Sequence, residues 1–218
     1  MSGIHNDLRT SCLTYTQRTR HGNSMQIIVH QWAFPGSFER LAELPRQEIV
    51  NDWFGFDVDP SAQYCFATDG TDLWFLASRE TPCTVHPESG PGQFQEELWK
   101  YDVAEWFMAA DDSTNYWEFN LAPNGAWWAC AFSDVRTKND NIPAPQGIET
   151  LYTGEDGAWT TMAKIPLASL TGVDIRHCKL AAAFILNSPE QLFLTTTDDL
   201  NGEPDFHRPE NFTAPVLK

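Results

Sequence analysis

The chain has 218 residues, of which 42% are hydrophobic and 20% are charged. This length and composition allow one globular domain with a substantial hydrophobic core, and they exclude a disordered chain. Fourteen Lys and Arg residues stand against 30 Asp and Glu residues, which gives a formal net charge of −16 at pH 7. Because a field of this sign repels phosphate backbones and anionic lipid, we expect no nucleic-acid partner and no membrane partner.

Residues 1–24 differ from the rest of the chain in charge and pattern. They carry three Arg and one Asp, and they show no hydrophobic periodicity. The sequence therefore predicts a flexible N-terminal arm over 1–24 and one domain over 25–218, with a start of the protein at Met25 as the alternative. The arm does not resemble a secretory signal and the five cysteines are irregularly spaced, so we expect a reducing, cytoplasmic location.

Many short runs rich in aromatic and β-branched residues follow, each bounded by Gly, Pro, Asn or Asp. Runs of this kind predict β-strands. In chain order the predicted strands are Gln26–Phe34, Trp53–Val58, Ala62–Thr68, Asp72–Arg79, Val103–Ala109, Asn115–Leu121, Ala126–Phe132, Trp159–Ile165, Cys178–Asn187 and Gln191–Thr197. Their spacing predicts an all-β fold, an antiparallel β-sandwich of jelly-roll type with few short helical turns.

The connections between these runs carry the turn and helix signals. Asp69-Gly70 and Asn124-Gly125 each lie between two runs and predict hairpins with type I′ turns. The segments 80–95 and 134–150 lack strand character, so they are either solvated connectors or loops that frame a site. Single helical turns are expected over Phe38–Glu43, over Glu96–Lys100 and directly after Pro166.

Nine tryptophans are more than a core of this size needs, so some are expected at the surface. Trp74, Trp106 and Trp117 lie in mid-strand among apolar residues, and we expect them in the core. Trp99 lies at the edge of a strand directly after a loop rich in Pro and Gly, so its ring is expected to project from the sheet. Exposed flat rings favour carbohydrate binding, because they can cover the C–H face of a sugar.

Two neighbouring strands place carboxylates among apolar residues. Strand alternation puts Glu105 on one face of its strand, and Glu118 with Asn120 on one face of the next. If these strands pair, the three side chains line one polar surface. A buried carboxylate needs a ligand hydroxyl, a metal or a cation, because an unpaired buried charge is costly. The alternative to a ligand is an internal ion pair of Glu105 with Arg79 or Arg136.

Other chemistry remains open at this stage. Two Glu residues on neighbouring strands are also what a glycoside-acting enzyme needs, so Glu105 and Glu118 define an enzymatic alternative. Calcium is the best metal candidate, because hard oxygen ligands gather in two loops, with metal-free acidic turns as the alternative. The two candidate calcium sets are Asp111, Asp112 and Asn115, and Asp198, Asp199, Asn201 and Glu203.

The chain contains, in order, the segments LWKYDVAEWFMAADD, NYWEFNLAPNGAWWACAF, AWTTMAKIPLASL and PDFHRPENF. Together they resemble the family 9 carbohydrate-binding modules and the related DOMON-like domains, and the resemblance spans residues 25–217. It implies a β-sandwich that holds the reducing end of a sugar between two aromatic rings, while nearby polar side chains bind the hydroxyls.

Matched position by position, the resemblance implies that Trp99 is the first stacking ring and that Glu105 hydrogen-bonds the sugar. Phe206 stands where family members carry the second Trp. Asn187 matches an Asn after the penultimate strand, and Asn120 stands where family members carry an Arg.

The sequence thus predicts non-catalytic carbohydrate binding, with a sugar or glycan end as the ligand. The predicted ligand-binding residues are Trp99, Glu105, Asn120, Asn187 and Phe206. The resemblance implies a structural Ca²⁺ as the candidate cofactor. Some related DOMON domains bind haem through Met and His, so Met108 and His207 define a haem-binding alternative. A protein partner on the aromatic surface is a further alternative.

Overall fold

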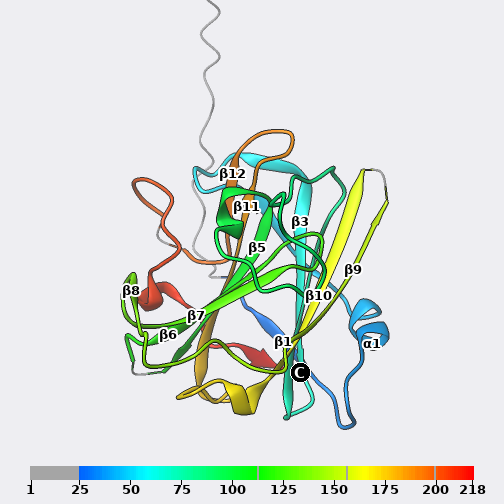
Figure 1. Cartoon of the computed structure of the whole chain (residues 1–218). Coiled ribbons are helices and arrows are strands. Elements are labelled where there is room, and N and C mark those ends of the chain that lie inside the picture. Colours follow the sequence, from blue (N-terminus) through cyan, green and yellow to red (C-terminus); the bar gives the residue numbers. More distant parts are fainter. Residues whose placement is uncertain (1–24, 112, 156, 199) are drawn as a thin grey trace, which may run out of the picture.

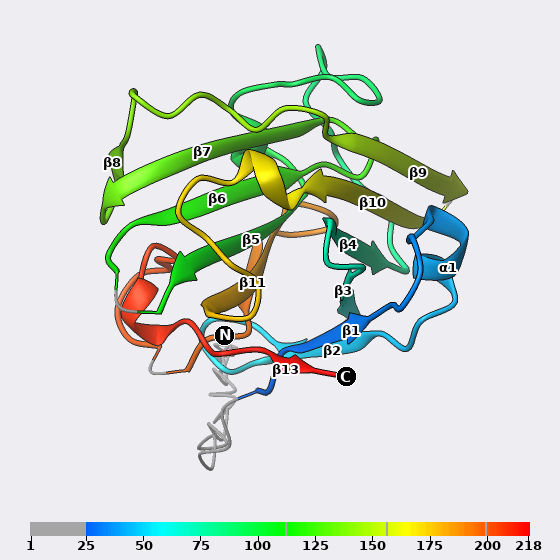
Figure 2. The same cartoon turned by 90° about the horizontal axis from the view of Figure 1, so that it is seen from below.

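Two β-sheets packed face to face form the fold (Figures 1 and 2). The structure is a computed structural model, and it describes residues 25–218 except residues 112, 156 and 199. The predicted N-terminal arm, 1–24, lies outside the described residues. Within the described part of the chain, no helix is long and apolar enough to cross a lipid bilayer.

The first sheet has seven strands in the order β13-β1-β3-β4-β10-β9, with β2 paired to β3. Its strands are β1 (Ile28–Gln31), β2 (Gln47–Asn51), β3 (Asp57–Thr68), β4 (Asp72–Arg79), β9 (Glu149–Glu155), β10 (Ala158–Pro166) and β13 (Val216–Leu217). Strand β1 pairs in parallel with both β3 and β13, whereas the other pairs are antiparallel.

The second sheet has six antiparallel strands in the order β12-β11-β5-β6-β7-β8. They are β5 (Val103–Ala110), β6 (Tyr116–Leu121), β7 (Trp127–Asp134), β8 (Thr137–Lys138), β11 (Cys178–Leu186) and β12 (Leu192–Thr195). The helical elements are α1 (Phe38–Ala42) and the 3-10 turns η1 (Leu98–Lys100), η2 (Leu167–Ser169) and η3 (Pro209–Asn211).

The predicted antiparallel β-sandwich is confirmed, but four strands were missed and one predicted strand is wrong. The missed strands are β2, β8, β9 and β13. Trp53–Val58 is mostly a turn, because the Asp52 carboxylate accepts the backbone N–H groups of Phe54 and Phe56 and Gly55 has a φ of 87°. Side-chain capping of this kind competes with strand pairing, and the apolar composition of the run conceals it.

Both predicted hairpins form, and their turn type differs from the prediction. Gly70 and Gly125 have φ values of 84° and 81°. Asp69 and Asn124 are not among the described residues with positive φ, whereas a type I′ turn needs positive φ at both central positions. The Asp69 carboxylate accepts hydrogen bonds from the backbone N–H groups of Thr71 and Asp72. These hydrogen bonds hold a loop that is longer than the two residues of a type I′ hairpin.

Strand alternation separates a core between the sheets from a second apolar cluster on the outer face of the six-stranded sheet. In β5, Trp106 and Met108 point into the core, whereas Val103 and Phe107 belong to the outer cluster. The C-terminal segment covers part of that outer face with Phe206 and Phe212. The outer face of the six-stranded sheet therefore carries buried apolar side chains, and the C-terminal segment packs over part of it.

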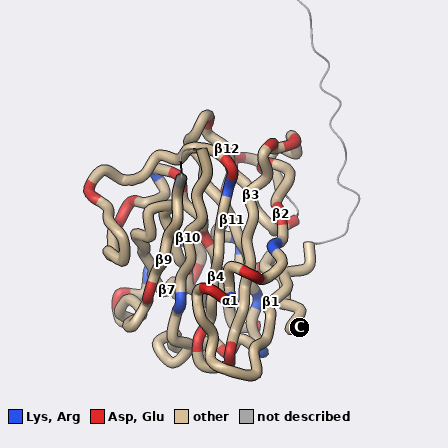
Figure 3. The backbone as a smooth tube through the Cα atoms, turned by 90° about the vertical axis from the view of Figure 1, so that its right-hand side faces the viewer, with Lys and Arg blue, Asp and Glu red and all other residues tan. Residues whose placement is uncertain are grey.

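The tryptophans distribute largely as predicted. Trp74, Trp106 and Trp117 are buried, although Trp74 packs beneath α1 and not between the sheets. Of the nine tryptophans, all within the described residues, Trp99 is the one that is exposed. The surplus of tryptophans is therefore absorbed mainly by packing. Figure 3 shows the Asp and Glu positions spread over loops at both ends of the sandwich, in keeping with the net charge of −16.

Candidate functional site

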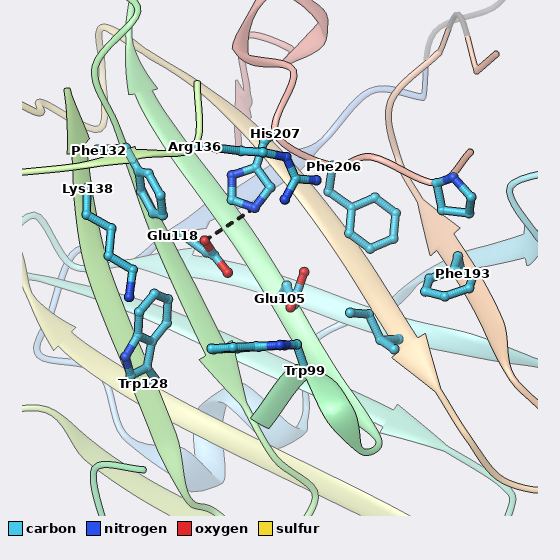
Figure 4. Close-up of a pocket in the computed structure, with 12 residues that line it drawn as sticks. Trp99, Glu105, Glu118, Trp128, Phe132, Arg136, Lys138, Phe193, Phe206 and His207 are labelled. Atoms are coloured by element: carbon cyan, nitrogen blue, oxygen red, sulfur yellow. Dashed lines mark ion pairs between the residues drawn. The ribbon is translucent and has the colours of Figure 1, made fainter. Parts of the chain in front are cut away.

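A cavity of about 360 Å³ opens on the outer face of the six-stranded sheet (Figure 4). Strands β5 to β8 supply most of its floor, and η1 and the C-terminal segment form its walls. Its lining residues are Trp99, Glu105, Glu118, Trp128, Phe132, Arg136, Lys138, Ile185, Phe193, Pro204, Phe206 and His207. Aromatic rings and two carboxyl groups therefore share one concave surface.

Trp99 is presented by the short turn η1. The preceding Leu98 is fully buried in the outer cluster and anchors the turn, while Glu97 adopts a left-handed φ of 65° that turns the chain. The Trp99 ring is 38% exposed and meets Trp128 edge to face, with ring centroids 5.9 Å apart. One side of the ring is therefore braced, and the rest lines the cavity.

Phe206 forms the opposite wall. Its ring packs against Trp53 at 5.9 Å and Phe193 at 6.4 Å between centroids. The Trp53 indole donates a hydrogen bond to the Gly202 carbonyl at 2.9 Å, which fixes the loop before Phe206. In Figure 4, Glu105 lies between Trp99 and Phe206. The cavity thus has an aromatic ring on two sides and a carboxyl group between them.

Glu105 and Glu118 are buried on the cavity floor, with exposed fractions of 3% and 5%. Glu105 pairs with Asn120 in the strand register and Glu118 pairs with Phe107, so the two acids are diagonal neighbours on one face, roughly 7–8 Å apart at the backbone. Burial, followed by the charge of Glu118, raises the pKa of Glu105 well above its ordinary value. Burial raises the pKa of Glu118 to about 7.

The two acids differ in their partners. Glu118 accepts a hydrogen bond from the Asn120 amide at 3.1 Å, and its other oxygen lies 3.6 Å from Nε2 of His207. Glu105 has no hydrogen bond or ion pair to any residue that the structure describes. The alternative of an internal ion pair for Glu105 is wrong, because Arg136 pairs with Asp205 at 2.7 Å and Arg79 donates to backbone carbonyls.

A chain of hydrogen bonds fixes His207 beside Glu118. The backbone N–H of Arg136 donates to the Tyr116 hydroxyl at 3.1 Å, and that hydroxyl lies 2.7 Å from Nδ1 of His207. Burial raises the pKa of Tyr116 to about 12, so the phenol keeps its proton. Burial lowers the pKa of His207 to about 4, so the ring is neutral at pH 7, and the tautomer with its hydrogen on Nε2 accepts from the Tyr116 hydroxyl and presents Nε2–H to Glu118.

The structure brings three of the five predicted ligand-binding residues to this cavity: Trp99, Glu105 and Phe206. Asn120 is fully buried behind the lining and reaches the cavity only through Glu118. Asn187 lies elsewhere. Its backbone N–H donates to Asp102 at 2.7 Å and its side-chain oxygen accepts from Gln191, so the structure does not bring it to this cavity, and its part in ligand binding stays a prediction.

Sequence reasoning missed several lining residues. Trp128 and Phe132 alternate along β7, and this period-two pattern could have placed both on the cavity face. Arg136 and Lys138 belong to the turn and short strand after β7, within the segment 134–150 that was expected either to frame a site or to be a solvated connector. Their approach to the cavity depends on tertiary structure, and no local pattern predicts it.

The two cofactor alternatives fare differently. Met108 is buried between the sheets, whereas His207 packs against Phe107 on the opposite face of β5, so these residues cannot bind one haem iron together. For calcium, Asp112 and Asp199 lie outside the described residues. Among the residues that the structure describes, no three His, Cys, Asp or Glu side chains gather as a metal site. Calcium binding stays a prediction.

No protein-family model matches the chain, and no curated protein matches it. Solved structures do. A protein from Bacteroides uniformis ATCC 8492, provisionally assigned as carbohydrate-binding, superimposes with a TM-score of 0.67 at 14% identity, covering 91% of this chain and 100% of that one. A family 9 carbohydrate-binding module from Caldicellulosiruptor kristjanssonii, solved with glucose, gives a TM-score of 0.58 at 11% identity, covering 88% and 96%.

The same module solved with cellotriose gives a TM-score of 0.57 at 11% identity, covering 88% of this chain and 94% of that one. This chain has a fold like that of the family 9 carbohydrate-binding modules. The fold implied by the sequence resemblance is therefore confirmed for that family. At identities this low the likeness establishes the fold alone, so ligand and site residues are argued from the cavity itself.

Proposed function

We propose that the protein is a non-catalytic carbohydrate-binding module that holds a sugar in the cavity on the outer face of the six-stranded sheet. One observation carries the proposal: an exposed ring, Trp99, faces Phe206 across a buried carboxyl group, Glu105, in a cavity of about 360 Å³. The fold likeness to modules solved with glucose and cellotriose supports this assignment. A sugar or glycan end is the proposed partner.

The proposed binding mode follows from the chemistry of the walls. A pyranose ring has apolar C–H faces and polar hydroxyl edges, so its faces suit the rings of Trp99 and Phe206. The hydroxyls then meet Glu105 and Glu118, whose buried carboxyl groups gain hydrogen-bond partners. Because one small site buries limited area, we expect dissociation constants of roughly millimolar to micromolar.

Isothermal titration calorimetry with glucose and with cellotriose tests the proposal. Trp99→Ala removes the exposed stacking ring, and we expect it to weaken binding by roughly tenfold or more. Phe34→Ala is the matched control, since Phe34 is 72% exposed and does not line the cavity. Equal affinities for wild type and Trp99→Ala would show that the cavity is not the sugar site.

A second candidate function rests on the two acids. Glycoside hydrolysis needs a protonated acid and a second carboxylate, and a Glu118 pKa of about 7 suits a general acid. Release of reducing ends from a panel of polysaccharides tests this alternative. Activity that is lost in both Glu105→Gln and Glu118→Gln, with sugar binding retained, would make the protein an enzyme.

A further inference from the structure

Among the described residues, no Lys or Arg forms an ion pair with either acid on the cavity floor, although Arg136 and Lys138 lie on the cavity lining and favour the ionised acids at longer range. Glu105 is 3% exposed and points into the cavity (Figure 4). It makes no hydrogen bond and no ion pair with any described residue. The histidine beside Glu118, His207, is neutral at pH 7, because burial lowers its pKa to about 4. Two adjacent buried carboxyl groups without a cation are unfavourable when ionised.

The two cations on the cavity lining, Arg136 and Lys138, make their direct contacts with groups other than the two acids. The Lys138 ammonium lies 4.9 Å over the Trp128 ring at the rim, and the Arg136 guanidinium pairs with Asp205 of the C-terminal segment at 2.7 Å. Tyr116 of β6 is hydrogen-bonded to His207 and keeps its proton. Strand β11 contributes Ala183 opposite Glu105 in the register, which adds no charge. A cation on the ligand would add the direct ion pair that these residues do not make with the acids.

We propose that the cavity selects an amino sugar, a hexose carrying a protonated amine, over the neutral sugar of the same shape. The inference rests on the proposed function and names the ligand class of the same site. An ammonium group beside Glu105 and Glu118 supplies the direct ion pair that the lining cations do not, and its N–H groups donate to carboxylate oxygens that have few partners. A neutral hexose offers hydroxyls alone.

A proton change should accompany such binding. Burial raises the pKa of Glu118 to about 7, and burial followed by the charge of Glu118 raises the pKa of Glu105, so the free cavity holds a proton on Glu118 at pH 6. A ligand ammonium favours the ionised carboxylates and lowers these pKa values, so a proton leaves the protein when the amino sugar binds. A neutral sugar causes a much smaller release. Proton release thus reports the acid pair directly.

The experiment is calorimetry on the full chain at pH 6 in two buffers of different ionisation enthalpy. The titrants are D-glucosamine, D-glucose, N-acetyl-D-glucosamine and D-glucuronate. We expect glucosamine to bind roughly tenfold tighter than glucose, with release of about one proton. N-acetylation removes the charge but keeps the ring, so N-acetylglucosamine should lose this preference.

A charge-removing variant tests the role of the acid pair. Glu118→Gln keeps the shape of the side chain, and we expect the ratio of glucosamine to glucose affinity to fall toward about one. Glu149→Gln is the matched control, because Glu149 is exposed and pairs with Lys164 at 2.6 Å on the other sheet. Glucose binding and thermal unfolding report whether each variant is folded.

The outcomes separate the two proposals. Equal affinity for glucose and glucosamine would overturn the amino-sugar inference and leave sugar binding in place. Tightest binding of glucuronate would also overturn it, since the rim cations Arg136 and Lys138 would then set the selectivity. Binding of none of the four sugars, by a protein that is folded, would remove the proposed function itself.

Discussion

Glu118 shows how one residue responds to its surroundings. The residue is 5% exposed, and its side chain accepts one hydrogen bond from Asn120 and faces a neutral histidine. Burial disfavours the charged form more than the Asn120 hydrogen bond and the Lys138 charge favour it, so the pKa rises from 4.5 to about 7. The folded protein therefore holds this proton at pH values where the unfolded chain has released it.

This difference makes stability depend on pH. Between pH 4.5 and about 7 the folded state binds more protons than the unfolded state, so the Glu118 contribution falls as pH rises. A shift of this size corresponds to roughly 3 kcal/mol in the free energy of unfolding by pH 8. We expect Glu118→Gln to gain stability relative to wild type between pH 5 and pH 8, measured by urea unfolding.

His207 acts in the opposite sense and serves as the internal check. Its pKa is lowered from 6.5 to about 4, so its contribution to stability rises with pH between these values in both proteins. Because His207 lies 3.6 Å from Glu118, its pKa is measured by NMR in both proteins, and its contribution is subtracted from the stability difference. A stability difference that stays constant from pH 5 to pH 8 would contradict the proposed environment of Glu118.

At the scale of elements, Asp102 links the loop before the site to the sheet. Its carboxylate accepts the backbone N–H and the hydroxyl of Thr84, and it also accepts the backbone N–H of Asn187 at the end of β11. The residue is 1% exposed and directly precedes β5. Asp102 therefore fixes the position of η1, and with it Trp99, relative to the cavity floor.

Asp102→Asn replaces one acceptor oxygen with a donor group that faces a backbone N–H. We expect a loss of about 1–3 kcal/mol in the free energy of unfolding, together with weaker sugar binding because η1 loses its support. Asp140→Asn, at an exposed position, is the control and should change neither quantity. Chemical denaturation and calorimetry measure the two effects, and wild-type stability of Asp102→Asn would refute the linking role.

At the scale of the molecule, the cavity is assembled from distant parts of the chain. Its walls come from η1 near residue 99, from strands β5 to β8, from β11 and β12, and from residues 204–207. The C-terminal segment closes the site and then returns to the other sheet as β13, which pairs with β1 (Figure 2). The site therefore combines the outer face of one sheet with a C-terminal segment that continues into the other sheet.

Ligand binding should therefore stabilise the whole fold. A sugar at one hundred times its dissociation constant adds about 2.7 kcal/mol to the free energy of unfolding. For a chain of this length this corresponds to a rise of roughly 5–10 °C in Tm, measured by scanning calorimetry. Trp99→Ala at the same sugar concentration should show a much smaller rise. An equal rise in both proteins would place the sugar outside the cavity.

The sequence by itself determined the fold class and the two faces of the central strands. Alternation in 103–110 and 116–121 separates Glu105 and Glu118 from Trp106 and Trp117, because neighbouring side chains in a strand point to opposite sides. It also identified Trp99 as the exposed ring, from its place after a loop rich in Pro and Gly. These are local properties, and local pattern is sufficient to read them.

Tertiary structure alone decided which residues meet. The resemblance placed Asn187 at the site, yet its backbone N–H donates to Asp102. Arg136 was one of two partners considered for Glu105 as the alternative to a ligand, yet it pairs with Asp205. Lys138 and His207 reach the cavity from segments that are about 70 residues apart in the sequence. Such contacts arise from the packing of loops across a sheet, and packing depends on the whole chain and not on local periodicity.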